Sequence, residues 1–295
     1  MQDALLEINY KAIRFDKQGS FGTTIIAEDE KKKKFAFKLI FIRTKYSEVN
    51  LDLQNKALKE AKIMSTLSHP NVVKYYGYFE VSDFFIIKME ECKGDLQQLI
   101  KCYSFLSVEN FIKYGYEISS GIQYIHDQGL ILRDLKPDNI LIDYMNVVKI
   151  ADFGLVAHTE NGRIEYSIQG VDFIEELKNE DPSLILQSIK SDCFSLGLVF
   201  YSCFGIQNFQ FIKIIQEQPN SIDLPSIIKD NQHPNKRISI SDAIKIFENL
   251  KKIHLPSLLN QQPDIFQQED INQIDYQQIH QQLKAKDEEI SKLQM

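Results

Sequence analysis

Tryptophan is absent from this chain of 295 residues, which has only four cysteines, 12 glycines and eight prolines. The cysteines form no C-x-x-C pair and no cluster with zinc-finger spacing, so a disulfide-stapled scaffold and a structural zinc site are not expected. The low glycine and proline content excludes a collagen-like or low-complexity chain. Hydrophobic residues make up 43% of the sequence, which is enough to build an ordinary globular core.

A surplus of positive charge is also missing, because 34 Lys and Arg face 41 Asp and Glu and the formal net charge is −7. General attraction to nucleic acid or to an acidic membrane is therefore not expected. The most apolar run, residues 193–206, is shorter than the roughly 20 residues that span a bilayer, and we interpret it as a helix buried on all sides. The first residues lack a basic stretch followed by an apolar one, so we expect no secretory signal and an intracellular, cytoplasmic protein.

The hydrophobic pattern changes along the chain from strand-like to helical. Extended segments are expected at residues 10–15, 23–27, 35–43, 72–78 and 84–89, with one helix at 51–67 among them. Helices are expected at 107–127 and over most of the chain from 192 to 255. A β-rich part followed by a helical part predicts an α+β fold, with the change near Lys93 and Gly94.

The last segment, residues 256–295, differs from both parts because it is rich in glutamine. Apolar residues from Tyr276 to Leu293 recur at steps of three and four, interrupted by Lys286. This pattern is a candidate for a short coiled coil and for self-association, although a surface helix explains it slightly better.

Four short motifs follow one another in a fixed order. They are Gly19-Ser20-Phe21-Gly22, Ala36-Phe37-Lys38, Arg133-Asp134-Leu135-Lys136-Pro137-Asp138-Asn139 and Asp152-Phe153-Gly154. Each motif alone has a plain structural explanation as a turn, a strand or a loop. Together, at this spacing, they carry a specific signal.

This constellation resembles the eukaryotic protein kinase family of the serine/threonine type, over residues 9–255. The resemblance implies a two-lobed protein-kinase-like fold, with a small β-rich N-lobe at residues 9–92 and a larger helical C-lobe at 93–255. It also implies ATP and Mg²⁺ as cofactors, a protein substrate, and transfer of the γ-phosphoryl group of ATP to serine or threonine hydroxyls.

The resemblance assigns the charged groups of such a site. Lys38 would bind the α- and β-phosphates, held in place by Glu60, whose alternative is a solvated helix position. Asp134 would accept the proton of the substrate hydroxyl, and Lys136 would neutralise the γ-phosphate. Asn139 and Asp152 would supply the hard oxygen ligands that Mg²⁺ requires.

The resemblance also outlines the nucleotide site. The phosphate loop would comprise Gly19, Ser20, Phe21 and Gly22. The adenine and ribose would contact Ala36, Met89, Glu90, Cys92, Asp95 and Leu141. Asp192 would anchor the catalytic loop from a central helix, and Arg237 would pair with a carboxylate, for which Glu180 is a candidate.

Three residues depart from the family pattern. Lys17 replaces the first glycine of the phosphate loop, Leu132 replaces the histidine before Arg133, and Val171 stands where threonine is usual. Leu132 can still pack with Met64, Tyr75 and Phe153. Candidate regulatory phosphorylation positions on the segment after Asp152 are Thr159, Tyr166 and Ser167. The departures support an alternative hypothesis, a pseudokinase that binds ATP or acts as a scaffold with weak or no phosphoryl transfer.

Overall fold

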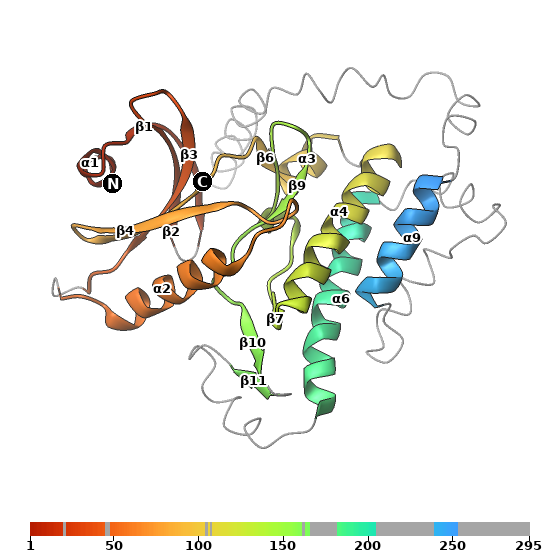
Figure 1. Cartoon of the computed structure of the whole chain (residues 1–295). Coiled ribbons are helices and arrows are strands. Elements are labelled where there is room, and N and C mark those ends of the chain that lie inside the picture. Colours follow the sequence, from red (N-terminus) through yellow and green to blue (C-terminus); the bar gives the residue numbers. More distant parts are fainter. Residues whose placement is uncertain are drawn as a thin grey trace, which may run out of the picture.

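The structure is a computed structural model of the chain, shown in Figure 1. It describes residues 1–19, 22–44, 48–103, 106, 108–160, 163–165, 182–204 and 239–252. Several predicted features lie outside these residues: Ser20, Phe21, Tyr166, Ser167, Val171, Glu180, Arg237, the tail 256–295 and the side chain of Thr159.

The first part of the chain forms one antiparallel five-stranded sheet with the strand order β1-β2-β3-β5-β4. Its strands are β1 (Lys11–Gly19), β2 (Gly22–Glu28), β3 (Lys34–Phe41), β4 (Tyr75–Val81) and β5 (Phe84–Glu90). The charged segment between β2 and β3 is a hairpin turn, as the sequence predicts, with Glu28 opposite Lys34. Strand β4 begins three residues later than predicted.

Each face of this sheet is covered by a helix. On one face, Leu5 of α1 (Gln2–Glu7) packs with Phe35, Phe37 and Leu39 of β3. On the other face, Ala61 and Met64 of α2 (Leu51–Thr66) belong to the same buried cluster as Ile40 and Phe85. The sequence predicts α2 but not α1, because six residues are too few to show a helical period.

Helix α2 begins at a capped residue and buries one face. The side chain of Asn50 accepts a hydrogen bond from the N–H of Leu53 at 3.1 Å. The helix ends at Thr66, shortly before Pro70, whose preceding residue resists the helical conformation. Glu60 points to the buried face and is only 5% exposed, so the alternative of a solvated helix position is wrong.

Short strands form the region between the sheet and the helices. Strands β6 (Gly94–Asp95), β8 (Ile140–Ile142) and β9 (Val148–Ile150) form one small sheet, and β7 (Leu130–Ile131), β10 (Ala157–Glu160) and β11 (Arg163–Glu165) form another. Helix α3 (Leu96–Tyr103) follows β6, and a 3₁₀ turn, η1 (Pro137–Asn139), precedes β8.

The helical part contains α4 (Val108–Asp127), α6 (Pro182–Phe204) and α9 (Ile240–Lys252). Phe111, Phe200 and Phe247, one from each helix, meet edge to face with ring centroids 5.0–5.8 Å apart. Helix α6 buries Cys193, Leu196, Val199 and Phe200 but leaves Leu198 50% exposed, so the prediction of burial on all sides is wrong for that residue. Within the described helices, none has the length and apolar character to cross a membrane.

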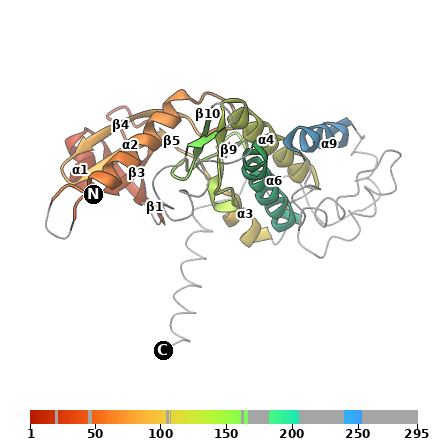
Figure 2. The ribbon, with the colours of Figure 1, turned by 90° about the horizontal axis from the view of Figure 1, so that it is seen from below.

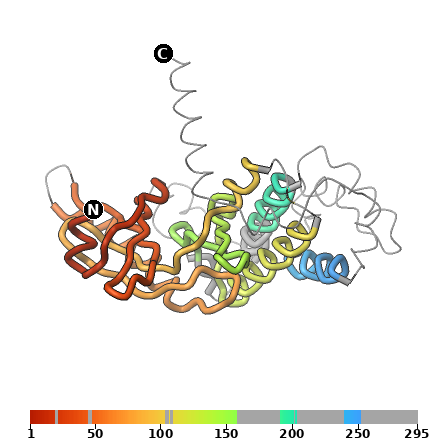
Figure 3. The backbone as a smooth tube through the Cα atoms, turned by 90° about the horizontal axis from the view of Figure 1, so that it is seen from above, coloured from red at the N-terminus to blue at the C-terminus, as the bar shows by residue number. Residues whose placement is uncertain are grey.

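The views from below and above show the sheet and the helices as two lobes side by side (Figures 2 and 3). Two backbone hydrogen bonds join the lobes through the segment that follows α2. Val73 N–H donates to the carbonyl of Ile150, and Ile150 N–H donates to the carbonyl of Asn71, both at 2.9 Å. The prediction of an α+β fold with a β-rich N-lobe and a helical C-lobe is confirmed.

Candidate active site

Lys38 of β3 and Glu60 of α2 form a buried ion pair between the N-lobe sheet and this helix. Lys38 lies on β3, between Thr24 of β2 and Ile87 of β5. Its Nζ lies 2.7 Å from Oε1 and 2.9 Å from Oε2 of Glu60 on α2. The side chains are 12% and 5% exposed, so water competes little for this contact. The pair fixes the position of α2 relative to the sheet.

Asp152 completes a three-residue cluster with this pair. Lys38 Nζ donates to Asp152 Oδ1 at 3.0 Å. Burial lowers the pKa of Lys38, but the charges of Glu60 and Asp152 outweigh it and hold that pKa above the ordinary value. Burial likewise raises the pKa of Asp152, and the ammonium group of Lys38 outweighs it, so the pKa lies below the ordinary value. Both groups are therefore charged at neutral pH.

Asp152 occupies a strained backbone conformation. Its φ is +64°, a region that residues with a side chain seldom adopt. The following Phe153 is 1% exposed and lies in one buried cluster with Leu132 and Met64, against which Tyr75 packs. This cluster is consistent with the prediction that Leu132 packs with Met64, Tyr75 and Phe153. The packed ring of Phe153 holds the preceding carboxylate toward Lys38.

The loop between β7 and β8 carries the second group of polar side chains. Lys136 Nζ lies 2.6 Å from Asp134 Oδ2, and Asn139 Nδ2 donates to the same oxygen at 3.0 Å and to the carbonyl of Asp134 at 2.9 Å. Ala151 N–H donates to the carbonyl of Asn139 at 2.9 Å, which fixes this loop beside Asp152. Residues predicted from two separate motifs thus lie next to each other.

Asp192 anchors this loop from α6, as the sequence predicts. Its fully buried carboxylate accepts the N–H groups of Leu132 and Arg133, each at 2.9 Å. The ring of His126, at the end of α4, lies 2.8 Å from Asp192 Oδ2. Arg133 has a φ of +67°, so the anchor holds a conformation that the chain does not favour by itself. Sequence reasoning missed the contact of His126, which lies 66 residues from its partner.

Strand pairing brings together some of the residues that are predicted to contact adenine and ribose. Ala36 is paired with Met89, and Asp95 is paired with Leu141. The N–H of Glu90 donates to the carbonyl of Lys74 at 2.9 Å, so a nucleotide contact at Glu90 falls to its carbonyl oxygen. Cys92 and Asp95, which follow Glu90 along the chain, are buried.

Asp95 is bound from two sides. Its Oδ1 accepts the N–H of Gln98 at 2.8 Å, at the start of α3, and its Oδ2 lies 3.4 Å from Lys17 Nζ. Burial raises the pKa of Asp95, while the charge of Lys17 acts in the opposite direction. Lys17 also reaches Asp138 on the loop that holds Asn139. The sequence marks Lys17 as a departure from the family pattern but gives no signal of these contacts.

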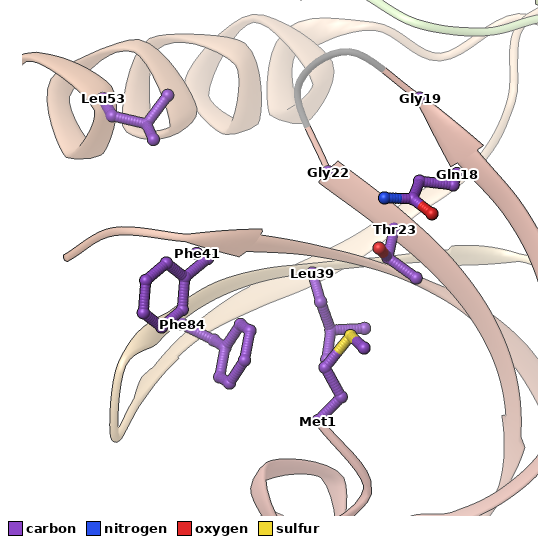
Figure 4. Close-up of a pocket in the computed structure, with 9 residues that line it drawn as sticks. All are labelled: Met1, Gln18, Gly19, Gly22, Thr23, Leu39, Phe41, Leu53 and Phe84. Carbon is purple, nitrogen blue, oxygen red and sulfur yellow. The ribbon is translucent and has the colours of Figure 1, made fainter. Parts of the chain in front are cut away.

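Of the predicted phosphate loop, the structure describes only its two glycines. A Cβ at Gly22 would lie 2.6 Å from the carbonyl oxygen of Leu39, so this position excludes larger residues. Figure 4 shows both glycines at the rim of a pocket of about 450 Å³. The pocket is lined by Met1, Gln18, Gly19, Gly22, Thr23, Leu39, Phe41, Leu53 and Phe84. Lys38, Asp134 and Asp152 do not line it, so it shares only the two glycines of the phosphate loop with the candidate active site.

The donor set fits Mg²⁺. Among the described residues, no three His, Cys, Asp or Glu side chains cluster closely enough to hold a metal by themselves. Asp152 offers a carboxylate, and the amide nitrogen of Asn139 is engaged by Asp134, which leaves its oxygen as the free end of the amide. One carboxylate and one amide oxygen suit an ion that takes its other ligands from phosphate and water.

Comparison with known proteins finds similarity to protein kinases. The family model described as the protein kinase domain matches residues 17–264. Aurora kinase B of Danio rerio is 30% identical over 188 residues, which are 63% of this chain and 57% of that protein. Serine/threonine-protein kinase polo of Drosophila melanogaster is 32% identical over 210 residues, 68% of this chain and 35% of that protein.

A bacterial relative shows the same pattern. Serine/threonine-protein kinase PrkC of Bacillus subtilis (strain 168) is 29% identical over 194 residues, 65% of this chain and 30% of that protein. The chain thus spans between about a third and somewhat over half of the length of these three relatives. The domain match covers most of the chain and agrees with the lobes and motifs described above, and the chain therefore belongs to the protein kinase family.

Proposed function

We propose that this chain is a serine/threonine protein kinase that uses ATP and Mg²⁺. The observation that carries the proposal is the joining of two groups of polar side chains. Lys38, Glu60 and Asp152 form one group, and Asp134, Lys136 and Asn139 form the other, with the Ala151–Asn139 backbone bond between them. This arrangement provides fixed charges of both signs, which phosphoryl transfer requires.

The chemistry follows from where the charges lie. The substrate hydroxyl oxygen bonds to the γ-phosphorus, the bond from that phosphorus to the bridging oxygen breaks, and ADP leaves. Asp134 takes the hydroxyl proton, while Lys38 and Lys136 offset the negative charge of the phosphates. Mg²⁺, when bound through Asn139 and Asp152, supplies further charge neutralisation.

Two relatives, polo and PrkC, are named as serine/threonine-protein kinases, and this supports the choice of acceptor, as does Lys136, two residues after Asp134. The proposal includes ATP contacts at five residues. Ala36 and Met89 are paired across β3 and β5, Glu90 and Cys92 follow Met89 along the chain, and Leu141 lies on β8.

Transfer of label from ATP tests this proposal. The purified chain, Mg²⁺ and a generic protein acceptor are incubated beside Asp134→Asn and beside Asp127→Asn, which removes an exposed carboxylate at the end of α4. We expect Asp134→Asn to lose roughly a hundredfold or more of the activity and Asp127→Asn to keep it. Equal labelling by all three proteins would remove the proposal.

A pseudokinase is the second candidate function, and the contact between Lys17 and Asp95 favours it. The carboxylate expected to bind the ribose is already engaged by a cation in the protein. A chain that binds ATP with Mg²⁺ but labels neither itself nor an acceptor would establish this alternative.

A further inference from the structure

Lys17 joins the two lobes at the candidate nucleotide site. It lies on β1 of the N-lobe, and its Nζ lies 3.4 Å from Asp95 Oδ2, 3.3 Å from Asp138 Oδ1 and 3.1 Å from the carbonyl oxygen of Asp138. Both partners belong to the C-lobe and lie far along the chain, 78 and 121 residues away. One ammonium group thus contacts the residue predicted to bind ribose and the loop that carries Asn139.

A β-bulge aims Lys17 toward these partners. In a regular strand, Lys17 would lie on the same face as Phe15, because side chains alternate with a period of two. The register between β1 and β2 shifts at Asp16, so that Phe15 pairs with Ile25 but Lys17 pairs with Thr24. Thr24 in turn pairs with Lys38. Directly paired residues share a face, so the bulge places Lys17 on the face of Lys38.

The contact places a cation beside the carboxylate that is predicted to bind the ribose. Oδ1 of this buried carboxylate already accepts the N–H of Gln98, and Oδ2 is the oxygen that Lys17 occupies. A ribose hydroxyl that donates to Asp95 therefore competes with the ammonium group for Oδ2. The side chains of Lys17 and Asp138 are 41% and 40% exposed, so dissolved salt weakens this end of the contact.

We infer that Lys17 is an ionic latch that holds β1 onto the C-lobe, and that the ribose of a bound nucleotide displaces its ammonium group from Asp95. The inference rests on the proposed function, because it takes a nucleotide as the ligand. Lys17 thereby sets the nucleotide affinity of this chain, and raising the salt concentration raises the affinity for a neutral nucleoside. Displacing the ammonium group breaks its contact with Asp95, so a bound ribose weakens the hold of β1 on the C-lobe.

Adenosine is the probe of choice because it carries the ribose without phosphate charge. Its dissociation constant is measured by calorimetry at low and high NaCl for the full chain, for Lys17→Met and for Lys11→Met, which removes an exposed lysine from the same strand. We expect Lys17→Met to bind adenosine about three- to tenfold more tightly than the unaltered chain at low salt. The affinity of the unaltered chain and of Lys11→Met should rise with salt, and that of Lys17→Met should not.

Other outcomes separate the alternatives. Equal adenosine affinity and equal salt dependence in all three proteins would overturn the latch. So would a loss of ATP affinity in Lys17→Met with no change for adenosine, because Lys17 would then be a phosphate-binding group.

A thermal unfolding cycle tests the ion pair without a ligand. Lys17→Met, Asp138→Asn and the double variant are compared, and we expect the two single effects not to add. Additive effects would overturn the latch even if nucleotide binds. Coupled effects with no binding of adenosine or ATP to any variant would overturn the ribose competition and the proposed function together, while the ion pair itself would remain.

Discussion

Glu60 holds Lys38 with both of its carboxylate oxygens, at 2.7 and 2.9 Å, while Asp152 contacts the same ammonium group at 3.0 Å. Three elements, β3, α2 and the segment after β9, therefore meet at one nitrogen atom. Because the pair is buried, removing the charge of either partner leaves the other charge uncompensated. A shift of α2 would move Glu60 away and leave Lys38 to Asp152 alone.

Replacement of Glu60 by glutamine should lower the rate of phosphoryl transfer by about a hundredfold, because Lys38 loses one of the two charges that position it. The measurement is labelled-phosphate transfer to a protein acceptor at saturating ATP. Asp52→Asn, an exposed position in the first turn of the same helix, is the matched control and should keep its activity. Full activity in Glu60→Gln would show that the ion pair does not position Lys38.

Replacement of His69 by asparagine should flatten the dependence of stability on pH. Burial and the charge of Lys149 lower the pKa of His69, and the unprotonated Nδ1 accepts the N–H of Asn71 at 3.1 Å. The stability from His69 is therefore present above its ordinary pKa of about 6.5 and is lost as pH falls through the lower pKa of the folded state. Asparagine keeps an oxygen acceptor but does not titrate.

The test for His69 compares urea unfolding at pH 7.5 and pH 5.5. The unaltered chain should lose more free energy of unfolding between these values than His69→Asn does. Identical losses in the two proteins would mean that His69 does not titrate differently in the folded state.

The cysteines should differ in reactivity toward iodoacetamide at pH 8. Cys102 is exposed, whereas Cys92 and Cys203 are buried, and burial raises the pKa of both buried thiols. Less thiolate and less access both slow alkylation, so Cys92 and Cys203 should react at least about tenfold more slowly than Cys102. Mass spectrometry of digested samples measures the rates, with unfolded protein as the reference. Rapid labelling of Cys92 in the folded chain would contradict the buried position described for it.

A methyl group at Gly115 should destabilise the C-lobe. A Cβ there would clash with the ring of Phe247, so the ring, or α4 and α9 themselves, would have to shift. We expect Gly115→Ala to lower the free energy of unfolding by about 1–3 kcal/mol, measured by urea denaturation. Phe247→Leu makes room for the methyl group, so the double variant should lose less than the sum of the two single losses. Strictly additive losses would exclude this clash as the cause.

Much of the secondary structure follows from local pattern. Both ends of α2 lie within a residue or two of the predicted range 51–67, and both ends of α4 lie equally close to the predicted range 107–127. Apolar residues recur in both segments at helical spacing. The pattern failed for α1, which is only six residues long, and for Leu198 of α6, where an apolar residue is exposed. A short apolar run does not reveal which of its side chains are buried against other elements and which stay exposed.

The order of the motifs named Lys38, Asp134, Asn139 and Asp152 as one candidate site, and the resemblance to the protein kinase family added Glu60 and Asp192. What local pattern left open was whether Glu60 is solvated or buried, since its neighbours Lys59 and Lys62 are charged. Only the packing of α2 on the sheet decides that question, because Glu60 shares a buried face with Ala57, Ala61 and Met64.

The sequence by itself determined the family, the division into a strand-rich and a helix-rich part, and the identity of the charged residues, because these depend on residue type and spacing. The tertiary structure decided the direction of Lys17. Alternation along β1 places this lysine with Phe15, and one bulge at Asp16 turns it toward Asp95 and Asp138. A bulge arises from pairing with a second strand, so a single strand's sequence does not contain it.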